Sequence, residues 1–257
     1  MNLLIEIIQL GLLFALGASL ASFFNAQIYR LENPSKPNSK YSYCEGCHKK
    51  LAPHELIPVF SFLLLKGKCR KCGYKIPSGY FFTELLLGIS LGLLFLFKQP
   101  IINYFITLLL AFLALYDLFY KSFPKVVMHL YLAAGLIYYL IQLYLHNVAF
   151  LTSGIPVALI ITTLLLGINL IKKSFGLGDI LVFLFLAFFL NIYQMSALFL
   201  ISICLAATYA IILLLLKRVK KEHHLALVPF IYLGWMVVIL LGNNMLQLIL
   251  ASWIPVW

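Results

Sequence analysis

The stretch FGLGDILVFLFLAFFL, residues 175–190, places an acid between a two-glycine turn and a new apolar run. Gly176 and Gly178 permit backbone angles that other residues avoid, and they leave space for another chain beside the carboxylate. This acid, Asp179, is one of only two aspartates; the other, Asp117, lies near the end of the apolar run 101–120. An acid in an apolar span usually has a function or lies at the headgroup boundary. With only two aspartates in the chain, we expect them to meet, and a boundary position is the alternative for each alone.

The composition indicates a membrane protein. Hydrophobic residues make up 63% of the chain and charged residues 11%, and the mean hydropathy is +1.02. Soluble globular chains carry about a quarter charged residues, so that class is excluded. We predict an all-α, polytopic membrane protein of about eight transmembrane helices with a small cytoplasmic zinc-binding insertion.

A transmembrane helix needs about 20 apolar residues. The apolar runs predict spans at residues 3–29, 80–97, 101–120, 126–145, 155–171, 179–192, 196–216 and 225–251, of which the sixth is short. We divide the chain into a first transmembrane helix (1–30), a cytoplasmic four-cysteine module (31–79) and a multi-span domain (80–257).

The basic residues indicate the orientation. The formal net charge is +11, and 18 of the 19 Lys and Arg residues lie in four stretches between the predicted spans. Such segregation marks the cytoplasmic side and attracts anionic lipid, so we expect membrane lipid as a partner and no nucleic acid. Eight spans with an external amino terminus place all four stretches on that side. Asp117 and Asp179 then share the cytoplasmic face.

Four cysteines form two C-x2-C pairs, Cys44/Cys47 and Cys69/Cys72, separated by 21 residues. Paired spacing of this kind is typical of a structural zinc site, in which four thiolates surround one tetrahedral ion. Two disulfides are the alternative, which a reducing cytoplasm disfavours. The fifth cysteine, Cys204, is expected to be a small buried apolar residue.

These features together resemble the bacterial type IV prepilin peptidases, membrane aspartic proteases of the Gly-x-Gly-Asp class. The resemblance covers residues 18–235 and rests on the order and spacing of several short pieces. The pieces are Ser22-Phe23-Phe24-Asn25, Ile28-Tyr29-Arg30, both cysteine pairs, Glu55-Leu56-Ile57-Pro58-Val59, Lys66-Gly67-Lys68-Cys69-Arg70, Tyr80, Glu84-Leu85, Asp117-Leu118, Pro124, Gly176-Leu177-Gly178-Asp179 and Val228-Pro229-Phe230.

The resemblance implies that Asp117 and Asp179 form a catalytic pair with Gly176 and Gly178 as a supporting turn. Two neighbouring carboxylates share a proton, so one activates water while the other donates to the developing oxyanion. The implied substrates are pilin or pseudopilin precursors, cut after a glycine that ends a short basic leader. The implied location is the bacterial cytoplasmic membrane, with the active site facing the cytoplasm.

The resemblance also implies N-methylation of the new amino terminus with S-adenosylmethionine. This activity would depend on the segment between the first two spans, where Glu55 and Glu84 are the nearest acids; structural roles for both glutamates are the alternative. Three positions depart from the family pattern: Glu45 replaces a proline, Leu181 a lysine, and Lys125 an aspartate.

Two other classes of function compete with an enzyme. In a proton-coupled transporter the two aspartates would be a relay and the zinc module a regulator. Both acids lie at one face rather than along a pathway, which disfavours a relay. In the other class, the chain would be an assembly scaffold with a zinc docking domain. The sequence does not indicate an oligomeric state.

Overall fold

The computed structural model describes residues 2–32, 41–121, 125–146, 153–171, 176–216 and 225–253. Within these ranges the chain is helical, and its only β structure consists of isolated bridges, which confirms the all-α prediction. The elements are α1 (Asn2–Glu32), η1 (Pro53–Leu56), α2 (Phe60–Leu64), α3 (Ser78–Leu96), α4 (Ile101–Tyr120), α5 (Lys125–His146), α6 (Ile155–Ile171), α7 (Leu177–Ala187), α8 (Ile192–Leu215) and α9 (Val228–Trp253).

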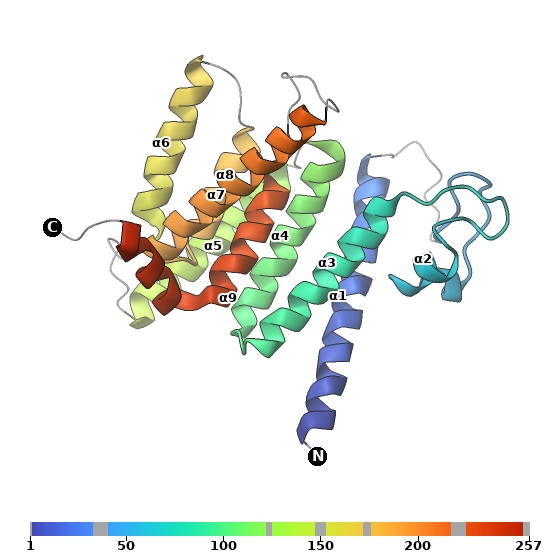
Figure 1. Cartoon of the computed structure of the whole chain (residues 1–257). Helices are drawn as coiled ribbons and strands as arrows, with labels where there is room; N and C mark the ends of the chain where they lie inside the picture. Colours follow the sequence, from blue (N-terminus) through green and yellow to red (C-terminus); the bar gives the residue numbers. More distant parts are fainter. Residues whose placement is uncertain are drawn as a thin grey trace. The chain divides into compact units, whose positions relative to one another are not determined.

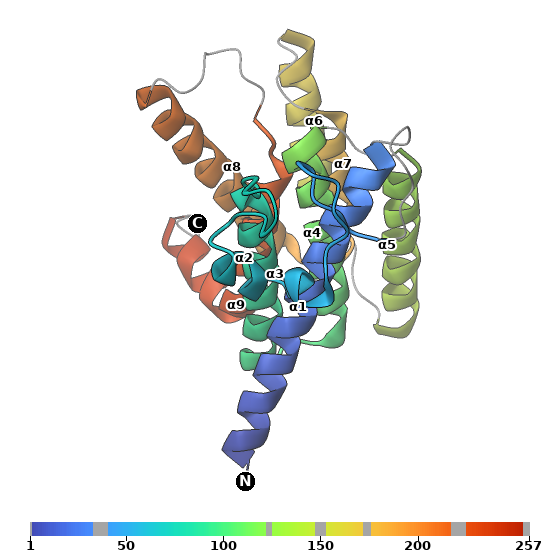
Figure 2. The same ribbon diagram turned by 90° about the vertical axis from the view of Figure 1, so that its right-hand side faces the viewer.

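The chain forms two compact units, Met1–Leu115 and Tyr116–Trp257, and α4 runs from one into the other. In the first unit, α1 and α3 pack side by side (Figures 1 and 2). Gly17 makes this possible, because a Cβ atom there would lie 2.6 Å from the carbonyl oxygen of Leu87. At Gly88, on α3, a Cβ atom would lie 2.9 Å from the ring of Phe14. Small residues at such crossings allow two backbones to approach closely.

A small lobe, residues 41–77, lies where α1 ends and α3 begins (Figure 1). It contains η1 and α2 and both cysteine pairs, and is otherwise made of turns. A lobe this small has little hydrophobic core of its own, so it needs other stabilising interactions to keep its fold.

In the second unit, α7 packs against α5, α6 and α8. Its side chains Val182, Phe183, Phe185 and Leu186 have no exposed surface. A helix of 11 residues is about 16 Å long and does not span a bilayer alone. Surrounded by other helices, α7 can be short because protein covers it.

Helices α8 and α9 also pack together in this unit. A Cβ atom at Gly234 would lie 2.6 Å from Ser202 Oγ, and neighbouring Trp235 is fully buried. Gly242 interrupts α9 with non-helical angles, φ 71° and ψ 170°. The eighth predicted span is therefore bent near its middle.

Among the described residues, five helices are long and apolar enough to cross a membrane: Leu3–Glu32, Ser78–Leu96, Ile101–Tyr120, Val126–Leu145 and Ile192–Leu215. Three shorter apolar helices lie at Ile155–Leu170, Leu177–Ala187 and Val228–Gly242. The chain is a multi-pass membrane protein, and its apolar helices fall in the order predicted from the sequence.

One predicted boundary is wrong. The sixth span was placed at 179–192 and the seventh at 196–216, but α7 ends at Ala187 and α8 begins at Ile192. The cause is a helix cap: Gln194 N donates to Asn191 Oδ1 over 2.9 Å, and Asn191 N donates to Gln194 Oε1 over 3.1 Å. This reciprocal pair starts a helix one residue after Asn191.

Candidate functional site

Asp117 lies in the last turn of α4, in the second unit, and is 5% exposed. Its Oδ2 atom accepts a hydrogen bond of 3.0 Å from the backbone N–H of Val228. Val228 is the first residue of α9, where backbone N–H groups have no partner inside the helix. A carboxylate at a helix start is stabilised by these donors and by the helix dipole.

Asp179 lies in the first turn of α7 and is 8% exposed. Its Oδ2 atom accepts a hydrogen bond of 3.1 Å from the N–H of Gly176. Gly176 itself has φ −72° and ψ 144°, an ordinary extended conformation.

The two glycines do not use the backbone angles that glycine permits, since neither Gly176 nor Gly178 has a positive φ. The requirement at Gly176 is for space. A Cβ atom there would lie 3.3 Å from Asp179 Oδ2, which is tighter than most such contacts.

The two aspartates belong to the same unit, and their carboxylates are near enough to interact as charges. Each uses its Oδ2 atom to accept a backbone N–H. Two buried carboxylates that interact in this way cannot both carry a full charge at low cost.

The four cysteines meet in the lobe. The Sγ atoms of Cys44, Cys47, Cys69 and Cys72 all lie within 4.8 Å of one another. None of the four forms a disulfide, and Cys44 Sγ lies 3.7 Å from Cys72 Sγ. Four thiols converging from two turns fit the tetrahedral coordination of a zinc ion.

The two cysteine pairs have the same backbone hydrogen bonds, a similarity that the sequence did not reveal. Cys44 N donates to Lys49 O and Cys69 N donates to Tyr74 O, both five residues ahead. The N–H groups of Cys72 and Lys71 lower the pKa of the Cys69 thiol to about 6, whereas burial and the neighbouring thiols raise the pKa of Cys72 to about 11. A thiolate is the form that binds metal, so the turn favours metal binding at Cys69.

Cys204 does not behave as expected. It is exposed on α8 rather than buried. Ile203 and Leu205 flank it in sequence, and a thiol on such an apolar helix suits a lipid environment as well as a protein core.

Both glutamates named from the sequence accept hydrogen bonds that stabilise the lobe. Glu84, on α3, is 9% exposed and its Oε2 atom accepts the N–H of Val59 over 2.8 Å. Val59 has φ 64°, a conformation that a β-branched residue rarely adopts. Glu84 thus ties a strained turn of the lobe to the membrane helix.

Glu55 acts within the lobe. Its Oε2 atom accepts the N–H of Ala52 over 2.9 Å, and Lys49 Nζ lies 3.4 Å from its Oε1 atom. The Ala52 hydrogen bond and the Lys49 charge lower the pKa of the Glu55 carboxyl.

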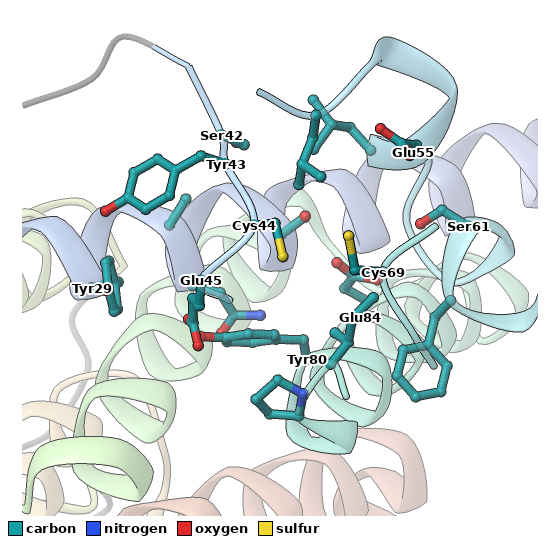
Figure 3. Close-up of a pocket in the computed structure, with 18 of the residues that line it drawn as sticks. Tyr29, Ser42, Tyr43, Cys44, Glu45, Glu55, Ser61, Cys69, Tyr80 and Glu84 are labelled. Atoms are coloured by element: carbon teal, nitrogen blue, oxygen red, sulfur yellow. The ribbon is translucent and has the colours of Figure 1, made fainter. Parts of the chain in front are cut away.

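A cavity of about 640 Å³ lies within the first unit, lined by α1, the lobe and the start of α3. Figure 3 shows Cys44 and Cys69 on its wall together with Glu45, Tyr80 and Glu84. The hydroxyl groups of Tyr74 and Tyr80 donate to Glu45 over 3.2 and 3.5 Å. Ser22 and Asn25 on α1 also line the cavity; the sequence named them only as a piece of the family resemblance and assigned them no role.

Several predicted features lie outside the described residues: Phe175, Pro124, Lys172, Lys173 and the basic residues from Lys217 to Lys221. The side chain of Lys125 is also outside them, although its backbone begins α5.

Comparison with known proteins found two matching family models. The bacterial peptidase A24 N-terminal domain matches residues 15–98, and the type IV leader peptidase family matches residues 104–211. Together they cover both units and include the cysteines and both aspartates.

Named relatives agree with these models. The prepilin leader peptidase/N-methyltransferase of Bacillus subtilis is 29% identical over 251 residues, which is 93% of this chain and 97% of the relative. A protein of the same name from Vibrio cholerae is 30% identical over 48% of this chain and 51% of the relative. A type 4 prepilin-like proteins leader peptide-processing enzyme of Escherichia coli is 30% identical over 66% of each chain. No solved structure matches significantly. These matches give no support to a proton-coupled transporter.

Proposed function

Because the chain belongs to the type IV leader peptidase family, we propose that it is a membrane endopeptidase that removes the short basic leader of pilin-like precursors. The cut follows the glycine that ends the leader. The similarity to prepilin leader peptidases over nearly the whole chain carries this proposal. The residues to which the reaction is assigned are Asp117 and Asp179.

In the proposed mechanism the two carboxyls share one proton, and each is held by a backbone N–H on its Oδ2 atom. The ionised carboxylate takes a proton from water, and that water attacks the scissile carbonyl carbon. The protonated carboxyl donates its proton to the developing oxyanion and becomes ionised. As the C–N bond breaks, the carboxyl that took the proton from water passes it to the leaving amine, and the ionised carboxylate takes a proton back from the tetrahedral hydroxyl, which restores the pair. The two macroscopic pKa values of such a pair belong to the pair and not to either residue.

Asparagine substitution tests this assignment without removing the backbone contacts. In Asp117→Asn and Asp179→Asn, the amide oxygen still accepts the N–H of Val228 or Gly176. Neither variant can exchange a proton as an acid does. We expect each to slow cleavage at least about a thousandfold, near the upper range for general acid–base catalysis.

The assay is cleavage of a candidate precursor by the purified enzyme reconstituted in lipid vesicles, read by the mass of the product amino terminus. Membrane insertion and metal content of each variant serve as controls. Near-normal cleavage by a correctly inserted variant would show that its carboxylate is not catalytic.

We propose that the enzyme resides in the bacterial cytoplasmic membrane with the lobe and both aspartates facing the cytoplasm. The segregation of basic residues supports this orientation, and those residues would also contact anionic lipid. The proposed division is a first transmembrane helix (1–30), a zinc module (31–79) and a multi-span peptidase domain (80–257).

We also propose that Cys44, Cys47, Cys69 and Cys72 hold one structural zinc ion. Four protein ligands leave no open position, so the ion stabilises the lobe and does not activate water. A second reaction, N-methylation of the new amino terminus with S-adenosylmethionine, is supported by the names of the relatives. The bound donor would supply a reactive methyl group.

A further inference from the structure

The cavity of the first unit contains an acceptor that has no partner among the described residues. Asn25, on α1, lines the cavity and is 7% exposed. Its Nδ2 atom donates to Thr83 Oγ1 over 2.9 Å, which fixes the orientation of the amide. Its Oδ1 atom is buried and accepts no hydrogen bond from the described residues. Buried polar atoms rarely lack a partner, so each exception calls for an explanation.

The cavity that Asn25 lines contains further acceptors. Glu84 lines it too, and its Oε2 atom accepts the N–H of Val59. Glu45 lines the cavity as well. A ligand that complements this wall brings hydrogen-bond donors, and a positive charge on them would complement the glutamates.

The size of the cavity suits a small molecule or a chain end. Its volume of about 640 Å³ lies within the roughly 300–1,000 Å³ typical of ligand sites. Arg30 and Arg70 line it too, so a carboxylate on the same ligand would also find a partner.

We propose that this cavity binds the free amino group of a ligand, with Asn25 Oδ1 and Glu84 as the acceptors. This inference rests on the proposed function, which offers two sources of such a group. One is the amino terminus that leader cleavage creates. The other is the amino acid portion of S-adenosylmethionine. Both sources share an amine with three N–H donors when protonated.

Calorimetric titration of the full-length, zinc-loaded protein in detergent tests the inference through binding alone. Two probe pairs separate the sources. S-adenosylhomocysteine is compared with 5′-methylthioadenosine, which lacks the amino acid portion. A short peptide beginning at the mature amino terminus is compared with its N-acetylated form. We expect at least one amino-bearing probe to bind about tenfold more tightly than its partner, since a charge-assisted hydrogen bond has about that effect.

Variants of Asn25 and Glu84 test whether these two residues cause the preference for the amino-bearing probe. Asn25→Leu keeps the approximate volume but removes the acceptor, and Glu84→Gln keeps an oxygen for Val59 but removes the charge. Each should reduce the preference at least about fivefold, a value within the range of one hydrogen bond. Asn25→Asp, which retains the acceptor and adds a charge, should increase it. Ser90→Ala, a buried α3 residue that does not line the cavity, is the matched control and should leave the preference unchanged.

The inference is overturned if the wild-type protein binds both members of each pair equally, or if the preference survives in Asn25→Leu and Glu84→Gln. It is also overturned if Asn25→Asp fails to increase the preference while its zinc content is normal. Precursor cleavage by the wild-type protein is measured in parallel. Cleavage without an amine preference counts against this inference alone, and an amine preference without cleavage counts against the proposed function alone.

Discussion

Alanine at position 17 should weaken the contact between α1 and α3. The new Cβ atom would lie 2.6 Å from Leu87 O, about 0.8 Å inside the 3.4 Å at which ordinary contacts begin. The nearest atoms belong to the backbone of α3, so no side chain can turn aside to make room. The two helices would have to separate.

The magnitude follows from a comparison within the same helix. Gly11 has no atom within 4 Å of its ideal Cβ position. Gly11→Ala and Gly17→Ala share the gain in helix propensity, so the difference between them isolates the contact. Overpacking typically costs about 1–3 kcal/mol, and we expect Gly17→Ala to be less stable than Gly11→Ala by about that amount.

The measurement is the free energy of unfolding of each variant in mixed micelles, titrated with a denaturing detergent and followed by circular dichroism. Metal content confirms that the lobe is intact at the start of each titration. Equal stability of the two variants would refute the close approach of the helices at Gly17.

Three further predictions concern the lobe. Full-length protein carrying Cys44→Ser and Cys69→Ser should lose its zinc, measured by elemental analysis, and full zinc occupancy would contradict the assignment. Glu84→Ala leaves the Val59 N–H without an acceptor and should destabilise the lobe by about 1–3 kcal/mol, measured as faster transfer of zinc to a chelator; an unchanged rate would mean that the bond is dispensable. Because folding lowers the pKa of Glu55, its stabilising effect is complete above the reference value of 4.5 and lost as the pH falls below it. The difference in lobe stability between the wild-type protein and Glu55→Gln, measured by tyrosine fluorescence, should shrink over that acidic range, and a constant difference would show that the charge is not involved.

The sequence predicted what depends on nearby residues. The order of the helices could be predicted because each apolar run by itself indicates a helix in an apolar environment. The cysteine spacing indicated which thiols could meet. The ends of the helices were predicted less well. Hydropathy alone places the start of the seventh span too late, because α8 begins at the Asn191–Gln194 cap, a pattern that the sequence also contains.

The long-range hydrogen bonds around the cavity could not be predicted from the sequence. Asn25 meets Thr83 across 58 residues, and Glu84 meets Val59 across 25. No local pattern encodes such partners, because they depend on how α1 and α3 cross. The cavity that these residues line was therefore missed, although Glu84 itself was named as a candidate.

The hydrogen bond between Asp117 and Val228 has a consequence for the newly made protein. The two residues are 111 positions apart, and translation at roughly 5–20 residues per second separates their synthesis by roughly 6–22 s. During that interval the carboxylate of Asp117 has no α9 to hold it. A nascent chain can thus contain both aspartates and all its cysteines and still lack the contact that orients one of its two proposed catalytic acids. On this reasoning proteolytic competence arrives only once α9 has been made and inserted.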